Sequence, residues 1–244
     1  MAAASIVQFE FRQLAKRLFA SVALGCAFAM LGSGCVYFSK HTVEGACSND
    51  LGSPIRNFCV VTPGVLWRGE RPSKKDASWL LQHGVGTVVN LEVVLDDHIA
   101  FEDAAVSSDL TRTVDYFQIR DFEPVHALNW SLLDDHVARF LAVVSNSPKP
   151  VYVHCLDGID RTSVLIAAYR MLIEGYSREK ALEEMERFHS PWHRVDAKYI
   201  NSLQGARRAE LLHKLEQYKS KLHAPAQIVC ASGKCTYKEQ SPLA

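Results

Sequence analysis

The segment from Val151 to Thr162 constrains the fold of this chain more than any other feature of its sequence. An apolar run over 150–154 predicts a short strand, a glycine-containing loop follows it, and residues 161–174 predict a strongly apolar helix that ends at Gly175. Apolar strands of this kind are typical of parallel sheets, which helices cover on both faces. The segment therefore predicts a layered fold of strands and helices.

The rest of the chain continues this alternation. The spacing of apolar side chains predicts strands over 59–61, 65–67, 87–91 and 113–119, and helices over 73–83, 99–107, 129–144, 177–189 and 195–222. Ser73 and Ser177 occupy N-cap positions at the starts of two of these helices. We therefore expect the α/β class, with a central, mainly parallel sheet flanked by helices.

The N-terminal part of the chain has a different character. Arg12, Lys16 and Arg17 precede an uncharged run that extends to Ser39, and its apolar part has about the length of a signal-peptide core. Basic residues before such a run predict that the N-terminus stays in the cytosol while the following chain crosses the membrane. We expect residues 1–35 to be a signal, lipoprotein or membrane-anchor segment that tethers the protein to a membrane or exports it.

The end of this run leaves three alternatives open. Leu31-Gly-Ser-Gly-Cys35 resembles a bacterial lipoprotein cleavage box, although Leu31 stands one place too far upstream. Cys26, after Ala23-Leu-Gly25, is a weaker acceptor. The third alternative is an uncleaved anchor that keeps the folded domain in the cytoplasm.

Composition divides the remainder of the chain. Residues 36–57 are rich in Gly, Ser, Asn and charge and indicate a linker, the folded domain is expected over 58–222, and the tail over 223–244 is expected to be loose apart from a clip between Cys230 and Cys235. If Cys35 carries lipid and Cys155 is reactive, Cys47 and Cys59 remain beside the tail pair. This even set predicts up to two disulfides of open pairing, against the alternative of reduced thiols.

The composition also argues against two classes of function. The 27 basic residues equal the 27 acidic residues, which gives no support for nucleic-acid binding. The seven cysteines include no Cys-x-x-Cys pair, so we expect no metal site.

Cys155 stands where the predicted strand gives way to the loop. The N-terminus of the following helix and the guanidinium of Arg161 both favour a thiolate there. The backbone N–H groups from Leu156 to Arg161 can converge into an anion cradle, and Gly158 permits a backbone conformation that a side chain would forbid. Arg161 can grip two oxygens of a phosphoryl group with its planar fork. This segment thus combines a nucleophile, an anion cradle and a cation.

The pattern His154-Cys155-x-x-Gly158-x-x-Arg161-Thr162 resembles the signature of the cysteine-based protein tyrosine and dual-specificity phosphatase superfamily. The resemblance implies a protein tyrosine phosphatase-like fold, a phosphocysteine intermediate and no cofactor or metal. It implies that Thr162 helps to expel the thiolate and that His154 tunes the thiol. The phosphate would lie against the loop residues Leu156, Asp157, Gly158, Ile159, Asp160 and Arg161.

The resemblance extends beyond the loop. The stretch from Gly64 to Pro72, a predicted helix and then the stretch from Gly84 to Leu91 resemble the opening of small dual-specificity-like and of plant-and-fungal atypical phosphatases. Together with the loop, the resemblance covers roughly residues 58–205.

A proton donor for the leaving group has three candidates. The family places an aspartate on a mobile loop some thirty residues before the cysteine, and Asp121, directly after a predicted strand, is our choice. Glu123 is its nearest rival. The loop Cys155-x-Asp157-Gly-x-Asp160-Arg-Thr also resembles that of myotubularin-type phosphoinositide phosphatases, which makes Asp160 the third candidate.

The expected substrate is a phosphorylated protein, with a phosphoinositide or inositol phosphate as the alternative. Asp157 and Asp160 would repel highly charged inositols unless Arg68 or Arg71 lines the mouth, and both arginines would equally fit structural ion pairs. The alternative outside the enzymes is a catalytically silent phosphate-binding module, against which the retained cysteine argues.

Overall fold

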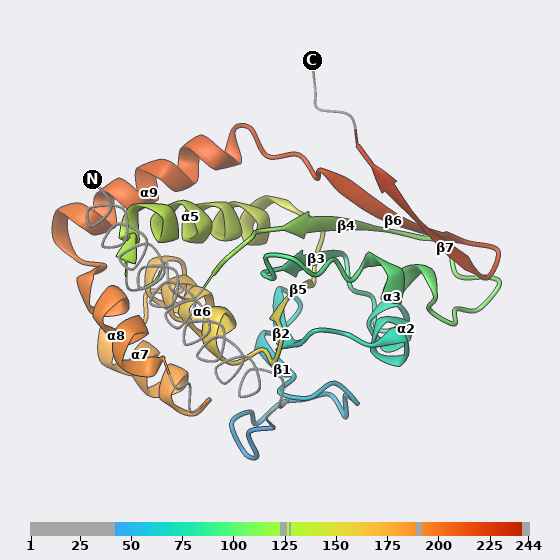
Figure 1. Ribbon diagram of the computed structural model, residues 1–244, viewed down its shortest axis with the longest axis horizontal. Coiled ribbons are helices and arrows are strands. Elements are labelled where there is room, and N and C mark those ends of the chain that lie inside the picture. Colours follow the sequence, from blue (N-terminus) through green and yellow to red (C-terminus); the bar gives the residue numbers. More distant parts are fainter. Residues whose placement is uncertain (1–41, 123–125, 127, 189–191, 241–244) are drawn as a thin grey trace, which may run out of the picture. The chain divides into compact units, whose positions relative to one another are not determined.

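The computed structural model describes residues 42–122, 126, 128–188 and 192–240. In these residues seven strands form one sheet in the spatial order β1-β2-β5-β3-β4-β6-β7 (Figure 1). The strands are β1 (Cys59–Thr62), β2 (Leu66–Glu70), β3 (Thr87–Asn90), β4 (Arg112–Gln118), β5 (Val151–Cys155), β6 (Ala226–Ala231) and β7 (Lys234–Glu239). The expected segment 1–35 and Glu123 lie outside the described residues.

The sheet is parallel at its centre and antiparallel at its edges. The four central strands β2, β5, β3 and β4 run parallel, whereas β1 pairs with β2, and β6 with β4 and β7, in antiparallel fashion. The predicted parallel centre is confirmed. Because parallel strands share a direction, their carboxyl ends meet at one edge of the sheet.

Two apolar cores lie on opposite faces of the sheet, as the period of two in a strand requires. Val88 and Tyr152 point into one core, and their neighbours Val89 and Val153 point into the other. Because β5 is buried along its whole length, it needs apolar side chains on both faces.

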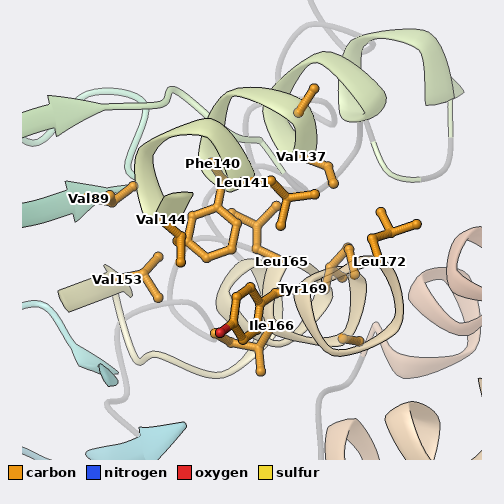
Figure 2. Packing of buried hydrophobic residues seen from close by; sticks show 14 of the residues in the cluster. Val89, Val137, Phe140, Leu141, Val144, Val153, Leu165, Ile166, Tyr169 and Leu172 are labelled. Atoms are coloured by element: carbon orange, nitrogen blue, oxygen red, sulfur yellow. The ribbon is translucent and has the colours of Figure 1, made fainter. Parts of the chain in front are cut away.

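Helices cover both faces, as the α/β class predicts. One core includes side chains of α2 (Lys74–Gln82) and α3 (His98–Glu102). The larger core includes side chains of five helices: α5 (Trp130–Asn146), α6 (Asp160–Leu172), α7 (Arg178–Glu186), α8 (His193–Ser202) and α9 (Gly205–Lys219). Figure 2 shows Phe140 and Leu141 of α5 packed with Leu165 and Tyr169 of α6 in this core.

The long helix predicted over 195–222 is wrong in one respect, because the structure divides it into α8 and α9. Gln204 has an extended backbone, and Gly205 takes a φ of +53°. Apolar side chains continue in step across the break, from Ile200 through Leu203 to Leu211, so the spacing alone predicts one helix. The helix expected over 99–107 is shorter, since α3 ends at Glu102.

The expectation of a loose tail is also wrong. Residues 226–239 form a β-hairpin that pairs with β4, and Ala226, Ile228 and Cys230 are buried against the sheet. Its turn residues Ser232 and Gly233 have φ values of +52° and +77°, as a tight hairpin turn requires. The predicted clip between Cys230 and Cys235 is present across this hairpin.

The second disulfide joins Cys47 to Cys59. It ties the segment expected as a linker to β1. Within the described ranges, no helix is both long and apolar enough to cross a bilayer.

Candidate active site

Cys155 is the last residue of β5, which lies between β2 and β3 at the centre of the sheet. Its side chain is buried, with 3% of its surface exposed, and among the described cysteines it alone stands outside a disulfide. The loop over 156–159, here called the phosphate loop, connects it to α6, which begins at Asp160. The thiol therefore lies at the carboxyl edge of the sheet and before a helix N-terminus, as predicted.

The first half of the phosphate loop is held from outside through its carbonyl groups. The backbone N–H of Arg71 donates to the Leu156 carbonyl over 3.2 Å. The Asn57 side chain donates to the Asp157 carbonyl over 2.8 Å. Asn57 also accepts a hydrogen bond from the backbone N–H of Val43, so it links the segment over 43–57 to the loop.

Arg68, on β2, holds the second half in the same way. Its Nη2 lies 2.5 Å from the Gly158 carbonyl, 3.5 Å from the Ile159 carbonyl and 2.8 Å from the Ser163 hydroxyl. The guanidinium also stacks on Phe188, with Cζ 3.4 Å from the ring centroid. Arg68 therefore fixes the loop to the start of α6.

These bonds determine where the loop amides point. In a trans peptide the C=O and the following N–H point in opposite directions. With the carbonyls of Leu156, Asp157, Gly158 and Ile159 bound from outside, the N–H groups of residues 157–160 turn toward the concave side of the loop. A row of amides that faces inward is an anion-binding concavity.

Gly158 is required for this close fit. Its φ is +68°, and a Cβ atom placed on it would lie 2.1 Å from the Gly69 carbonyl oxygen. No other residue type allows the loop to approach β2 so closely.

Arg161 lies in the first turn of α6 and is braced by two neighbouring strand ends. Its Nη1 donates to the carbonyls of Leu91 and Asp121, each over 3.2 Å. Leu91 follows β3 directly, and Asp121 lies three residues after β4. The guanidinium is thus oriented at the same edge of the sheet that carries Cys155.

His154 enters a buried polar network behind the thiol. Its Nε2 lies 3.0 Å from Asp97 Oδ2, and Asp97 also accepts hydrogen bonds from Asn90 and Tyr116. Burial acts to raise the pKa of Asp97, but the charge and hydrogen bond of His154 and the bond from Tyr116 outweigh it and hold that pKa below its ordinary value. An ionised Asp97 therefore fixes the His154 ring.

Thr162 is fully buried next to Arg161, and its hydroxyl has no hydrogen-bond partner in the described part of the chain. A buried hydroxyl without a partner is costly unless a bound group satisfies it. Its position in the first turn of α6 suits a donor to a group at the phosphate loop.

Asp121 does not have the environment of a proton donor. Its carboxylate is fully buried and lies 2.9 Å from His136 Nδ1 and 3.2 Å from His126 Nε2. Burial acts to raise the pKa of Asp121, but the hydrogen bonds and charges of the two histidines lower it well below its ordinary value. A fully buried carboxylate that two histidines hold in its ionised form is poorly suited to donate a proton to a leaving group, which weighs against Asp121 as the donor.

His126 joins Asp121 to α8. Its Nδ1 lies 2.8 Å from Asp196 Oδ1, so a single imidazole bridges two buried carboxylates. Burial acts to lower the pKa of His126, but both aspartates outweigh it and raise that pKa well above its ordinary value. Asp160, the first residue of α6, is half-buried, and its charge contributes to raising the pKa of Asp196 after the larger effect of burial.

Of the two arginines named for the mouth, Arg68 does not line it. Arg68 is 1% exposed and lies behind the phosphate loop, and Arg71 forms an ion pair with the buried Glu92 at 3.2 Å. The structural alternative is therefore confirmed for Arg71, whereas Arg68 forms no ion pair with any described carboxylate.

Several residues of the site escaped the sequence interpretation. Asn57 lies in the expected linker, and Asp97 lies in a loop without a motif that identifies it as the partner of His154. His136 gave the clearest unused signal, because it stands in the otherwise apolar face of α5 and is 5% exposed. A polar residue on a buried helical face needs a partner.

Comparisons with known proteins agree with this geometry. Residues 61–201 match the family described as DSP-PTPase phosphatase fused to NAD+ kinase. The probable chloroplastic NAD kinase 2 of Oryza sativa is 32% identical over 113 residues, which cover 45% of this chain and 11% of that protein. The dual specificity protein phosphatase TpbA of Pseudomonas aeruginosa is 45% identical over 139 residues, which cover 55% of each chain.

The chain thus spans only about a tenth of the NAD kinase and about half of TpbA. A crystal structure of a cysteine-to-serine variant of P. aeruginosa TpbA in complex with phosphotyrosine superposes with a TM-score of 0.53 at 21% identity. It covers 72% of this chain and 98% of that one, and this similarity shows the shared fold.

Proposed function

The chain belongs to the DSP-PTPase family of cysteine-dependent phosphatases, and from this premise we propose that it hydrolyses phosphate monoesters on proteins, phosphotyrosine among them. The observation that carries the proposal is the phosphate loop, whose carbonyls are bound from outside so that its amides face inward between Cys155 and Arg161. A tetrahedral anion is the ligand that such a ring of donors accommodates.

The reaction has two steps. The Cys155 sulfur forms a bond to phosphorus while the bond from phosphorus to the ester oxygen breaks, and the leaving oxygen takes a proton from an acid. Water then attacks the phosphocysteine and gives up a proton to the same acid residue, now a base, and inorganic phosphate and the Cys155 thiolate are released. Arg161 and the loop amides stabilise the charge on the equatorial oxygens, and Thr162 donates to the departing sulfur.

For the proton donor we propose Asp160. The depressed pKa of Asp121 argues against that residue, and Asp160 stands next to Arg161 at the half-buried mouth of the loop. D160N is expected to slow the hydrolysis of alkyl phosphates, whose leaving groups need a proton, much more than that of p-nitrophenyl phosphate. D121N serves as the comparison, and equal losses on both substrates in D160N would contradict the assignment.

Turnover of p-nitrophenyl phosphate under reducing conditions tests the activity itself. We expect C155S to lose all measurable turnover, and R161K to lose about 10²–10³-fold in kcat because the bidentate grip is gone. Both variants should keep the wild-type fold, checked by circular dichroism. A wild-type protein as inert as C155S that still binds phosphate would support the silent binding module instead.

A substrate panel tests the substrate class. Phosphotyrosine and phosphoserine peptides, phosphoinositides and inositol phosphates are compared by phosphate release from the full chain. We expect the phosphopeptides to give the highest kcat/KM, because Asp157 and Asp160 at the loop repel highly charged inositols. Preference for a phosphoinositide by tenfold or more would reassign the substrate.

We further propose that residues 1–35 tether the protein to a membrane, outside the cytoplasm. The basic residues before an apolar run support this, and so do the two disulfides, which are typical of oxidising compartments. Metabolic labelling with a fatty acid and fractionation of wild type and C35A test the tether. A protein that stays in the soluble fraction in both forms would exclude it.

A further inference from the structure

Arg68 is a buried cation whose charge no described carboxylate neutralises. It is 1% exposed, and its contacts are the two loop carbonyls, the Ser163 hydroxyl and the ring of Phe188. The charged groups that act most strongly on the pKa of Arg68 are Glu184, Cys155 and Arg170. Of these, Glu184 is already paired with Arg170 at 2.8 Å. A buried charge without a partner is expensive, so its retention needs a reason.

Arg68 keeps its charge at neutral pH. Burial lowers the pKa of Arg68 to about 10, and the negative charges of Glu184 and Cys155 act in the opposite direction. The interaction with the Cys155 thiolate is mutual: a thiolate that stabilises the guanidinium is stabilised by it in turn.

We propose that Arg68 is a positioning residue that stabilises the Cys155 thiolate and the bound phosphate from behind the phosphate loop. Its guanidinium does not touch the phosphate, because the carbonyls of Gly158 and Ile159 lie on its side of the loop. It acts twice, by turning these carbonyls outward and by supplying positive charge in a region from which water is excluded. Arg161 thus grips the anion from the open side, and Arg68 balances its charge from the closed side.

The inference deepens the proposed function and rests on the role of Cys155, but thiol reactivity tests it without any turnover. The full chain is treated with iodoacetamide over a pH series, and the rate is followed on the peptide that contains Cys155. Since only the thiolate reacts, the pH profile reports the pKa of the thiol. The other charged groups of the surroundings stay unchanged: Arg161 and Asp160 of α6, Asp157 of the loop, His154 of β5, Glu70 of β2 and Glu184 of α7.

R68Q is the decisive variant, since it keeps a hydrogen-bond donor and removes the charge. We expect the thiol pKa to rise by about one unit, which makes alkylation about tenfold slower at pH values below the wild-type thiol pKa. R207Q is the matched control, because Arg207 also packs on aromatic rings but pairs with Asp134. A folded R68Q with the wild-type thiol pKa would overturn the proposal, as would an equal shift in R207Q.

R68K keeps the test decisive if R68Q does not fold. It retains the charge and loses the planar fork, so the thiol pKa is expected to stay near the wild-type value while kcat falls because the loop loosens. A folded R68K whose thiol pKa rises by a full unit would assign the effect to the hydrogen bonds alone and contradict the electrostatic role.

Discussion

Gly158 sets the tightest steric limit at the phosphate loop. Its φ of +68° costs a side chain about 1–2 kcal/mol, and the Gly69 carbonyl leaves no room for a Cβ atom. We predict that G158A loses about 3 kcal/mol or more in the free energy of unfolding and nearly all activity. Urea unfolding and phosphate release measure both effects.

Gly175 provides the control for this prediction. Its φ is +71°, but a Cβ atom there would meet nothing within 4 Å. G175A should therefore lower the free energy of unfolding only by the cost of a side chain at positive φ, about 1–2 kcal/mol, and leave kcat unchanged. Equal effects of the two substitutions on activity would show that the contact with Gly69 is unimportant.

His126 makes the stability of the protein fall as the pH becomes alkaline. Because its folded pKa lies above its unfolded pKa of about 6.5, its contribution is complete below that pH and is lost as the pH rises toward the folded value. We predict a melting temperature that falls from about pH 7 upward in the wild type and less steeply in H126Q. H213Q, at an exposed histidine, should follow the wild type. If the melting temperature of H126Q fell as steeply with pH as that of the wild type, the charged state assigned to His126 would be wrong.

The sequence reveals those site residues whose chemistry is local. Cys155, Gly158 and Arg161 stand within one strand–loop–helix unit, so their spacing alone predicts their arrangement. The surroundings of Asp121 could not be foreseen, because its contacts with His126 and His136 form only in the folded chain. Spacing along a sequence does not indicate whether a carboxylate is buried.

At the scale of elements, the Cys47–Cys59 disulfide supports the phosphate loop. It closes the segment that contains Asn57, whose side chain donates to the Asp157 carbonyl. We predict that C47A/C59A loses about 2–4 kcal/mol of stability and about tenfold in kcat/KM, because the loop loses an external anchor.

The Cys230–Cys235 disulfide is the matched comparison. It closes a short loop across the β6–β7 hairpin, away from the segment that contacts the phosphate loop. C230A/C235A should therefore lower the melting temperature only slightly and keep wild-type kcat/KM. Loss of activity in this double variant, with none in C47A/C59A, would show that the segment closed by Cys47–Cys59 does not support the phosphate loop.

Elements were predictable where they are bounded by local signals. Ser73 caps α2 with a full capping box, and the expected start of that helix is confirmed. The break before α9 and the tail hairpin were missed. For the hairpin a signal existed, since Ser232-Gly233 separates two short runs with alternating burial, but the short length and the charges of β7 obscured it.

At the scale of the whole molecule, the hairpin is an integral part of the sheet. It covers the edge of β4, and Ile228 is fully buried while its neighbour Val229 is partly exposed. We predict that I228A lowers the free energy of unfolding by about 2–5 kcal/mol and V229A by less than about 1 kcal/mol. Both should unfold in one transition, and a separate early transition of the hairpin would show that it folds independently.

The overall architecture places the chemistry where parallel strands end. β3, β4 and β5 run in the same direction, so Arg161 contacts the carbonyls of Leu91 and Asp121 at the edge of the sheet that also carries Cys155. The parallel centre was foreseeable from apolar strands that alternate with helices. The antiparallel additions at both edges were not, because they depend on pairings between distant parts of the chain.

A phosphoryl group on Cys155 is the intermediate that the proposed reaction requires, and it can be detected directly. The full chain is mixed with a phosphorylated aryl substrate, quenched in acid within one turnover, and digested for mass spectrometry. We predict one phosphoryl group on the peptide that contains Cys155, in the wild type and not in C155S. Turnover without phosphate on this peptide, or phosphate on another residue, would contradict it.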